Sequence, residues 1–249
     1  MSLKSRLLTI ASQRFPALSS RVLASAGYTL DLDAYAGSTS TWSARTAARE
    51  DRAWQRLIAA AKSGHPREDI AALQQSLVAA PAEGTVLEVG CGGGYNSEIV
   101  AMASPGLDYT GLDLSAPSIE LCRAHYPDRR FIVGSAYALP FEDGAFDVVV
   151  DGVALLHIPE WRRALAEYAR VAGSVVILHG LTLTERPTTP FLKYAYGQPT
   201  FEQALNRREV EEAGAAHGLR VADRLRNLDY DLAEVLGIPT VSETWVLTR

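Results

Sequence analysis

The stretch "VLEVGCGGGYNSEIV", residues 86–100, decides the fold because it sets four glycines within five positions directly behind a short apolar run. Residues 86–89 are typical of a buried strand, and residues 95–100 can open a helix. The glycines between them let the backbone adopt conformations that a Cβ atom forbids. Such a unit usually holds a nucleotide-like ligand beside the helix N-terminus, where backbone N–H groups lack helical partners. The stretch therefore predicts an α/β fold with a ligand at this turn.

Composition narrows the classes of protein to consider. The 249 residues are enough for one large domain, or for a domain with an appendage. A hydrophobic content of 47% and a charged content of 21% are ordinary for a globular protein. The formal net charge of −5 gives no general basic field, so it disfavours RNA and DNA as partners. No apolar run reaches the roughly 20 residues of a membrane span, so we expect a cytoplasmic protein without a membrane partner.

The two cysteines and the first 30 residues give weaker signals. Cys91 and Cys122 form neither a disulfide framework nor a zinc-binding spacing, and we expect no metal. Residues 1–30 are basic and serine-rich, with no acidic residue, which resembles a transit peptide. The alternative, an amphipathic opening helix, is favoured because ordinary globular sequence follows.

The pattern along the chain changes near residue 82. Before it, the apolar spacing in residues 45–62 predicts an amphipathic helix, and Gly64 and Pro66 separate it from a second helix. After it, short apolar strands alternate with helices, which predicts a mostly parallel sheet covered on both faces. The predicted strands are residues 85–89, 108–112, 131–133, 146–150, 174–178, about 219–224 and 243–248.

We interpret this pattern as two parts of one chain. Residues 1–81 are predicted to form an N-terminal helical cap or lid, and residues 82–249 the core. An insertion at about 180–206, rich in Pro, Thr and Tyr, is predicted to be a long irregular loop of the kind that often carries function.

The spacing of the glycines separates two kinds of nucleotide site. A dinucleotide site needs G-x-G-x-x-G, whereas Tyr95 occupies the sixth position here. The observed G-x-G-x-G, with Glu88 two residues ahead of it, fits a ligand that lacks a pyrophosphate. Asp113 ends the next predicted strand about twenty residues after the loop, where a carboxylate can accept hydrogen bonds from ribose hydroxyls.

A third segment makes the pattern specific. Residues 131–158, "FIVGSAYALPFEDGAFDVVVDGVALLHI", follow "LEVGCGGG" and "GLDLS" in order. With these motifs the chain resembles class I S-adenosylmethionine-dependent methyltransferases of the small-molecule type, over residues 82–180 and more weakly to the terminal "ETWVLTR". The resemblance implies a Rossmann-like, seven-stranded, mostly parallel sheet with an antiparallel last strand, and S-adenosyl-L-methionine as cofactor.

The resemblance also assigns residues to the methionine end of the cofactor. It implies that Gly90, Cys91 and Gly92 approach that end with their backbone. Glu88 would orient the loop and interact, directly or through water, with the cofactor's amino group. Gly152, just after a predicted strand, would lie where the backbone meets the transferable methyl group.

The same resemblance assigns the nucleoside end. Asp113 would bind the ribose diol, Leu114 would flank the adenine, and Ala136 and Tyr137 would edge it. Ser135 departs from the family, which often has an aspartate there that accepts from the adenine amino group. A serine hydroxyl can accept the same bond without charge assistance.

Two histidines are candidates for work on the acceptor. The resemblance places His157, in the "LxHI" motif, at the mouth of the site, where it could act as a general base toward a hydroxyl acceptor. The alternative is a structural or substrate-orienting histidine. His179, which ends the run "SVVILHG", is a second candidate base.

Other residues are candidates for a lid or an acceptor site. Tyr35 and Trp42 lie in a polar loop and are either packing anchors or lid residues over the cofactor or acceptor. Lys193, Tyr194 and Tyr196 in the insertion are candidate acceptor contacts. We expect both segments to lie over the cofactor cleft.

The sequence thus predicts an S-adenosylmethionine-dependent methyltransferase that acts on a small-molecule acceptor, with an O, N or C nucleophile left open. One alternative is a module that binds S-adenosylmethionine without transferring its methyl group, because a fold does not establish chemistry. An NAD-dependent oxidoreductase is disfavoured by Tyr95 in the third-glycine position. The sequence gives no oligomeric state.

Overall fold

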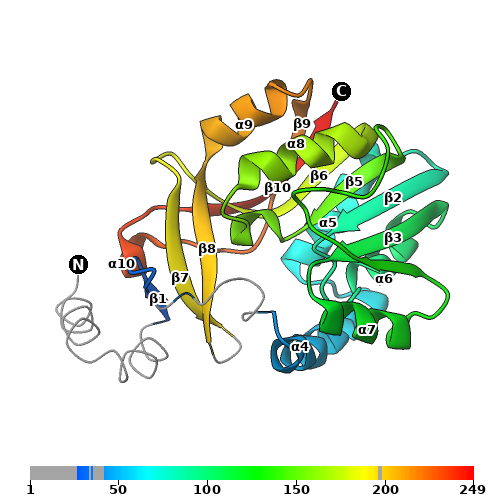
Figure 1. Cartoon of the computed structure of the whole chain (residues 1–249), viewed down its shortest axis with the longest axis horizontal. Coiled ribbons are helices and arrows are strands. Elements are labelled where there is room, and N and C mark those ends of the chain that lie inside the picture. The colour runs from blue at the N-terminus through cyan, green and yellow to red at the C-terminus, as the bar shows by residue number, and fades with distance from the viewer. Residues whose placement is uncertain (1–26, 34, 36–41, 196–197) are drawn as a thin grey trace.

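The computed structural model describes residues 27–33, 35, 42–195 and 198–249 (Figure 1). The opening helix or transit peptide predicted within residues 1–30 therefore lies almost wholly outside the described residues.

The core comprises seven strands of a ten-stranded sheet, in the order β4-β3-β2-β5-β6-β10-β9. Each strand is parallel to its neighbours except β10, which is antiparallel to both β6 and β9. The prediction of a Rossmann-like sheet with an antiparallel last strand is confirmed. The strands are β2 (Gly84–Val89), β3 (Leu107–Asp113), β4 (Arg130–Val133), β5 (Phe146–Gly152), β6 (Ala172–Thr184), β9 (Arg220–Arg226) and β10 (Val241–Thr248).

Burial of apolar side chains on both faces explains why the central strands were recognisable. In β5, four consecutive residues, 148–151, are buried, as expected for a strand covered by helices on both sides. Helix α8 (Trp161–Val171) buries Trp161, Ala164, Leu165 and Tyr168, the spacing of one helical face.

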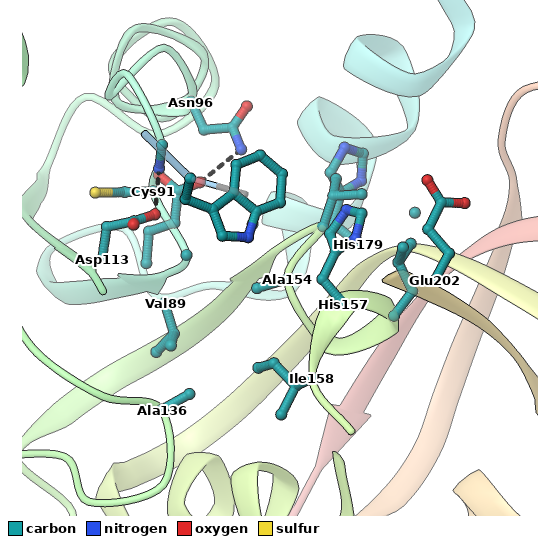
Figure 2. A pocket seen from close by; sticks show the side chains of 18 of the residues that line it. Val89, Cys91, Asn96, Asp113, Ala136, Ala154, His157, Ile158, His179 and Glu202 are labelled. Carbon is teal, nitrogen blue, oxygen red and sulfur yellow. Dashed lines mark hydrogen bonds between the residues drawn. The ribbon is translucent and has the colours of Figure 1, made fainter. Parts of the chain in front are cut away.

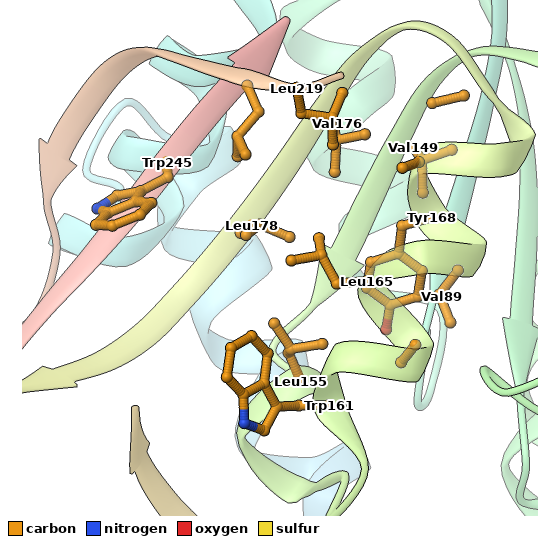
Figure 3. Close-up of a cluster of buried hydrophobic side chains, with 14 of the residues drawn as sticks. Val89, Val149, Leu155, Trp161, Leu165, Tyr168, Val176, Leu178, Leu219 and Trp245 are labelled. Carbon is orange, nitrogen blue, oxygen red and sulfur yellow. The ribbon is translucent and has the colours of Figure 1, made fainter. Parts of the chain in front are cut away.

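Helices cover both faces of the sheet, as Figure 1 shows. Helices α8 and α9 (Arg207–Ala215) close a core that includes Trp161, Tyr168 and Trp245 (Figure 3). The opposite core brings residues of four helices against the sheet. These helices are α4 (Ala44–Lys62), α5 (Glu68–Ser76), α6 (Asn96–Ala103) and α7 (Ala116–His125).

The described residues of the insertion lie mostly in strands, so the prediction of a long irregular loop is wrong. Strands β7 (Thr189–Ala195) and β8 (Gln198–Asn206) form an antiparallel hairpin, and β1 (Tyr28–Thr29) pairs with the outer edge of β7. The hairpin joins the core where the end of β6 pairs with the end of β8, and it stands beside the sheet in Figure 1. Mixed Pro, Thr, Lys and Tyr composition concealed these strands, because neither face of the hairpin is uniformly apolar; Lys193 and Glu202 lie on one face and Gln203 on the other.

The described part of the N-terminal segment contributes to the core. Helix α5 contacts β6, β9 and β10, and it buries Ile70 and Leu73 completely. The short elements of the remaining chain are η1 (Leu77–Ala79), η2 (Leu155–His157) and α10 (Ala233–Leu236). Within the described residues, no helix is both long enough and apolar enough to cross a lipid bilayer.

Candidate functional site

A cavity of about 500 Å³ opens at the carboxyl ends of β2, β3 and β5. This is where ligands bind in open α/β sheets. One half of it, here called the glycine-loop half, is lined by the glycine turn, the end of β3 and residues 134–137. The other, the hairpin half, is lined by His157, His179, the β7–β8 hairpin and residues near the start of β10. Figure 2 shows side chains of both halves around one space.

The glycine turn is built so closely that side chains cannot replace its hydrogens. Gly90 has φ +75°, and a Cβ atom there would lie 2.3 Å from the Cβ of Ala154. A Cβ atom on Gly152 would lie 2.4 Å from Oε1 of Glu88 and 2.7 Å from the carbonyl oxygen of Gly90. Between these contacts, Val153 has φ +64°, a strained conformation for a β-branched residue. The turn is therefore a cradle whose shape is fixed from both sides.

Glu88 is buried below the turn and is held by two donors. Its Oε1 accepts from Nδ2 of Asn96 at 2.7 Å, and its Oε2 accepts from the hydroxyl of Tyr109. Burial raises the pKa of Glu88 to about 7. The two hydrogen bonds lower the pKa, and the nearby carboxyl groups of Asp113 and Asp151 raise it. A cation beside the turn would favour the ionised form of this carboxyl group.

Asp113 closes the other side of the turn. Its Oδ2 accepts from the backbone N–H of Gly92 at 2.9 Å, and its Oδ1 accepts from that of Ser115 at 2.8 Å. Burial raises the pKa of Asp113, and these two bonds counteract that rise. Figure 2 shows the carboxyl group beside Cys91 in the cavity wall.

The remaining residues assigned to the nucleoside end lie around the same half. Leu114, Ser135, Ala136 and Tyr137 all line the cavity, and Leu114 is 46% exposed. The Ser135 hydroxyl accepts from the backbone N–H of Tyr137 at 3.2 Å, so it still has a proton to donate and a second lone pair. The substitution for aspartate thus leaves a polar group in place.

The two thiols are part of the packing below the glycine turn, and the Cys122 thiol donates to the carbonyl oxygen of Gly92 at 3.0 Å. Cys91 and Cys122 are buried, and burial raises the pKa of the Cys91 thiol well above its usual value. Cys91 lines the cavity within the glycine turn.

Asn96 is a site residue that sequence reasoning missed. It is the first residue of α6 and is 8% exposed, and its side-chain amide donates a hydrogen bond to Glu88. Its Oδ1 is buried and accepts no hydrogen bond from the described residues. Buried amide oxygens normally have partners, so this one invites a ligand donor. An asparagine at the start of a helix carries no motif of its own, so its place in the site could not be predicted from the sequence.

His157 occupies the border between the two halves. Its Nδ1 lies 2.7 Å from the carbonyl oxygen of Phe201 on β8, and a carbonyl only accepts, so Nδ1 carries the proton and Nε2 has the lone pair. Burial lowers the pKa of His157; Glu202 and the Phe201 bond raise it, and Lys193 lowers it. The ring of Trp42 contacts it edge-on, with centroids 5.2 Å apart.

The turn that carries His157 is fixed from two directions. The carboxyl group of Asp151 accepts from the backbone N–H of Leu155 at 3.0 Å, at the start of η2. The amide of Gln203 on β8 donates to the carbonyl of Ile158 at 2.7 Å. The hairpin therefore positions the His157 ring directly.

His179 is buried beside Gly152, its partner in the β5–β6 register. Its Nδ1 lies 2.9 Å from Oγ1 of Thr244, which also receives Nδ2 of Asn227 at 3.1 Å. Burial lowers the pKa of His179 to about 4, so the ring is neutral near pH 7. His179 is in the cavity wall and is held by a polar network; the carboxyl group of Asp69 raises its pKa and Arg67 lowers it, but burial outweighs both.

The hairpin half contains an ion pair that is mostly buried. Lys193 Nζ lies 3.3 Å from Oε1 of Glu202, and the hydroxyl of Tyr230 donates to Oε2 at 3.0 Å. Lys193 Nζ also lies 4.9 Å from the centre of the Tyr230 ring. Sequence reasoning found Lys193 but missed Glu202 and Tyr230, because only the folded chain brings these distant positions together.

The two predicted lid aromatics have different places. Trp42 lines the cavity, and its carbonyl accepts from the hydroxyl of Ser115 at 2.9 Å. Tyr35 packs on Phe201, with ring centroids 5.4 Å apart. Tyr196 lies outside the described residues.

The fold and the cavity together define a class I S-adenosylmethionine-dependent methyltransferase domain. Residues 87–177 match the family Methyltransf_11, described as a methyltransferase domain.

The chain is also similar to curated methyltransferases of two bacteria. The chain is 42% identical over 88 residues to phthiotriol/phenolphthiotriol dimycocerosates methyltransferase of Mycobacterium tuberculosis (34% of this chain, 33% of the relative). It is 35% identical over 131 residues to demethylmenaquinone methyltransferase of Renibacterium salmoninarum (51% and 48%). The chain thus spans a third to a half of the length of these relatives.

A solved structure shows the same fold. It is the 1,6-didemethyltoxoflavin-N1-methyltransferase of Burkholderia thailandensis with bound 1,6-didemethyltoxoflavin and S-adenosylhomocysteine. The TM-score is 0.54 at 15% identity, with 87% of this chain and 92% of that chain covered.

Proposed function

We propose that this protein transfers the methyl group of S-adenosylmethionine to a small-molecule acceptor. The observation that carries the proposal is one cavity that joins a tightly fixed glycine cradle to a polar wall with a neutral histidine at the border. Methyl transfer needs mainly an acceptor held in line with the carbon–sulfur bond, and such a two-part cavity can provide that positioning.

The residues of the glycine-loop half fit the cofactor. Its ribose would meet the fixed carboxyl group of Asp113, and its ammonium group would meet the unpartnered Oδ1 of Asn96, with Glu88 behind it. When bound, S-adenosylmethionine supplies an electrophilic methyl group. We assign cofactor binding to Glu88, Gly90, Cys91, Gly92, Asn96, Asp113, Leu114, Ser135, Ala136, Tyr137 and Gly152.

We assign the role of general base to His157. Its Nε2 lone pair is left available by the bond from Nδ1 to Phe201, and the lowered pKa keeps the ring neutral at pH 7. His179 is assigned to orientation, since burial lowers its pKa to about 4 and makes it a weak base.

We further propose that residues 1–81 and the insertion at 180–206 act as covers on a core of residues 82–249. Two contacts support this: Trp42 of the first segment contacts His157 of the core in the cavity wall, and Tyr35 packs on Phe201 of the insertion. Methyl transfer benefits from a closed site.

The proposed partners are limited to the small acceptor. The net charge of −5 argues against a nucleic acid, and the proposed location is the cytoplasm without a membrane partner.

Calorimetric titration tests the cofactor assignment. We expect binding of S-adenosylhomocysteine and none of NADH. Asp113→Ala should weaken binding by about 1.5–3 kcal/mol, the range for hydrogen bonds to a charged group. Asp108→Ala, on the exposed side of the same strand, is the matched control. Unchanged affinity in Asp113→Ala would place the ribose elsewhere, and binding without any turnover would favour the non-catalytic module.

Glu88 makes cofactor binding depend on pH. Because a bound ammonium group favours the ionised carboxyl group, and the pKa of Glu88 is about 7, binding should release a proton near neutral pH. Affinity for S-adenosylhomocysteine should therefore fall as the pH is lowered through 7, by at most about tenfold per pH unit. Calorimetry in buffers of different ionisation enthalpy measures this proton. Glu88→Gln should abolish the release; equal release in wild type and variant would refute the linkage.

A further inference from the structure

We propose that the acceptor is an uncharged molecule with at least two oxygen functions, one a hydroxyl that is methylated beside His157 and the other an oxygen anchored on Lys193 and Thr200 of the hairpin. This inference rests on the proposed function and names the substrate class of the same site.

The charges around the cavity favour an uncharged acceptor. Among the described residues that line it, the two cations are Arg67 and Lys193. Nε of Arg67 donates to Oδ1 of Asp69 at 2.7 Å, and Lys193 pairs with Glu202. Both positive charges are thus already compensated. Glu88 and Asp113 add further acidic groups on the glycine-loop side. A carboxylate or phosphate on the acceptor would enter a cavity with no surplus positive charge, at a high electrostatic cost.

The hairpin presents a donor to a neutral oxygen. The ammonium group of Lys193 has three N–H donors; Glu202 accepts one, and the Tyr230 ring faces another side. The Lys193 side chain is 33% exposed and lines the cavity, so a ligand can reach it. A carbonyl or hydroxyl oxygen can accept the remaining N–H without disturbing the pair.

Thr200 supplies the second observation. It stands directly opposite Lys193 in the β7–β8 register and also lines the cavity. Thr200 is 2% exposed, and its hydroxyl has no partner among the described residues. Buried hydroxyls are rarely left unpaired, because desolvation without a hydrogen bond is costly. An oxygen that reaches Lys193 lies next to this hydroxyl, so one polar group of the acceptor can satisfy both.

The presence of a base, His157, is the reason for expecting a hydroxyl at the methylated end of the acceptor. Lys193 and Glu202 both act electrostatically on His157, so the anchor and the base belong to one part of the cavity; Figure 2 shows His157, His179 and Glu202 together there. As the acceptor oxygen bonds to the methyl carbon, the carbon–sulfur bond breaks with its electron pair going to sulfur. The hydroxyl proton goes to Nε2 of His157. A neutral amine can attack through its lone pair without a base, and an unactivated C–H group is too weak an acid for imidazole to deprotonate. A hydroxyl is therefore the nucleophile whose reactivity this base increases most.

Methyl-labelled cofactor identifies the acceptor. The wild-type protein is incubated with a metabolite extract and S-adenosylmethionine that carries carbon-13 in its methyl group. The carbon-13 shift of the product shows which atom holds the methyl, and passage over anion- and cation-exchange resins shows its charge. We expect an O-methyl product retained by neither resin. An N-, C- or S-methyl product, or a charged one, overturns this inference alone. Absence of any product while S-adenosylhomocysteine still binds overturns the proposed function as well.

Two variants test the anchor by binding, independently of turnover. The double variant Lys193→Met/Glu202→Gln removes both charges and should raise the Kd of the purified acceptor for the S-adenosylhomocysteine complex about 10- to 100-fold. Thr200→Val should raise it about two- to tenfold. S-adenosylhomocysteine affinity should be unchanged in both.

The controls are matched by chemistry. Arg208→Met/Glu212→Gln removes an exposed ion pair on α9, and Thr189→Val removes a hydroxyl of β7 that bonds only within its own loop. Neither should change the acceptor Kd. Wild-type affinity for S-adenosylhomocysteine shows that the Lys193/Glu202 variant is folded. An unchanged acceptor Kd in that folded variant would refute the proposed anchoring of the acceptor on Lys193.

Discussion

Replacing His157 with glutamine should lower kcat by about 10²- to 10⁴-fold, the usual contribution of a general base. The bond from Nδ1 to the Phe201 carbonyl aims Nε2 away from β8, and the lowered pKa of the ring keeps that nitrogen unprotonated at pH 7. A glutamine amide can still donate to Phe201, so the turn should persist while the base is lost.

The pH profile separates a base from a structural histidine. Wild-type kcat/KM should fall as the pH drops through the lowered pKa of His157, since an imidazolium cannot accept a proton. The variant should lack this acidic limb and keep wild-type affinity for S-adenosylhomocysteine. His217→Gln, at an exposed position, should match wild type. A His157→Gln enzyme with wild-type kcat would assign the histidine to structure.

The second large effect is expected at Gly90. Gly90→Ala adds strain at φ +75°, about 1–2 kcal/mol, and a Cβ atom 2.3 Å from that of Ala154, about 1–3 kcal/mol of overpacking. We expect the free energy of unfolding to fall by about 2–5 kcal/mol and the Kd of S-adenosylhomocysteine to rise at least about tenfold, because the turn must move.

Gly144 provides the matched control. It has φ +66°, and a Cβ atom there would meet nothing within 4 Å. Gly144→Ala should therefore cost only the conformational strain and leave cofactor affinity intact. Denaturant unfolding and calorimetry on the two variants measure both quantities. Equal cofactor affinity in the two variants would contradict the proposal that the close packing at Gly90 shapes the cofactor site.

The core strands were predictable because their apolar runs are buried on both faces. Val148, Val149 and Val150 are each at most 1% exposed, so hydrophobicity alone marks β5. The glycine loop and Asp113 were predictable because their backbone geometry demands particular residues at fixed spacing.

The hairpin half was harder to predict because its residues come together only when the strands pair in the folded chain. Thr200 and Glu202 alternate with Phe201 along β8, and their shared face becomes a cavity wall only when β6 and β8 meet. Tyr230 reaches Glu202 across 28 positions of sequence. No local pattern encodes such contacts.

The junction of β6 with the hairpin has a consequence for how specificity can diverge. Among the described residues, only Leu183 and Thr184 of β6 pair with β8, whereas β6 pairs with β5 over residues 172–179 and with β10 over residues 175–183. Residues 189–203 can therefore accumulate substitutions without altering the strands that carry the glycine cradle. Descendants of this chain could exchange one acceptor for another while inheriting the cofactor site intact, which makes the hairpin the natural segment for recombination and for directed evolution.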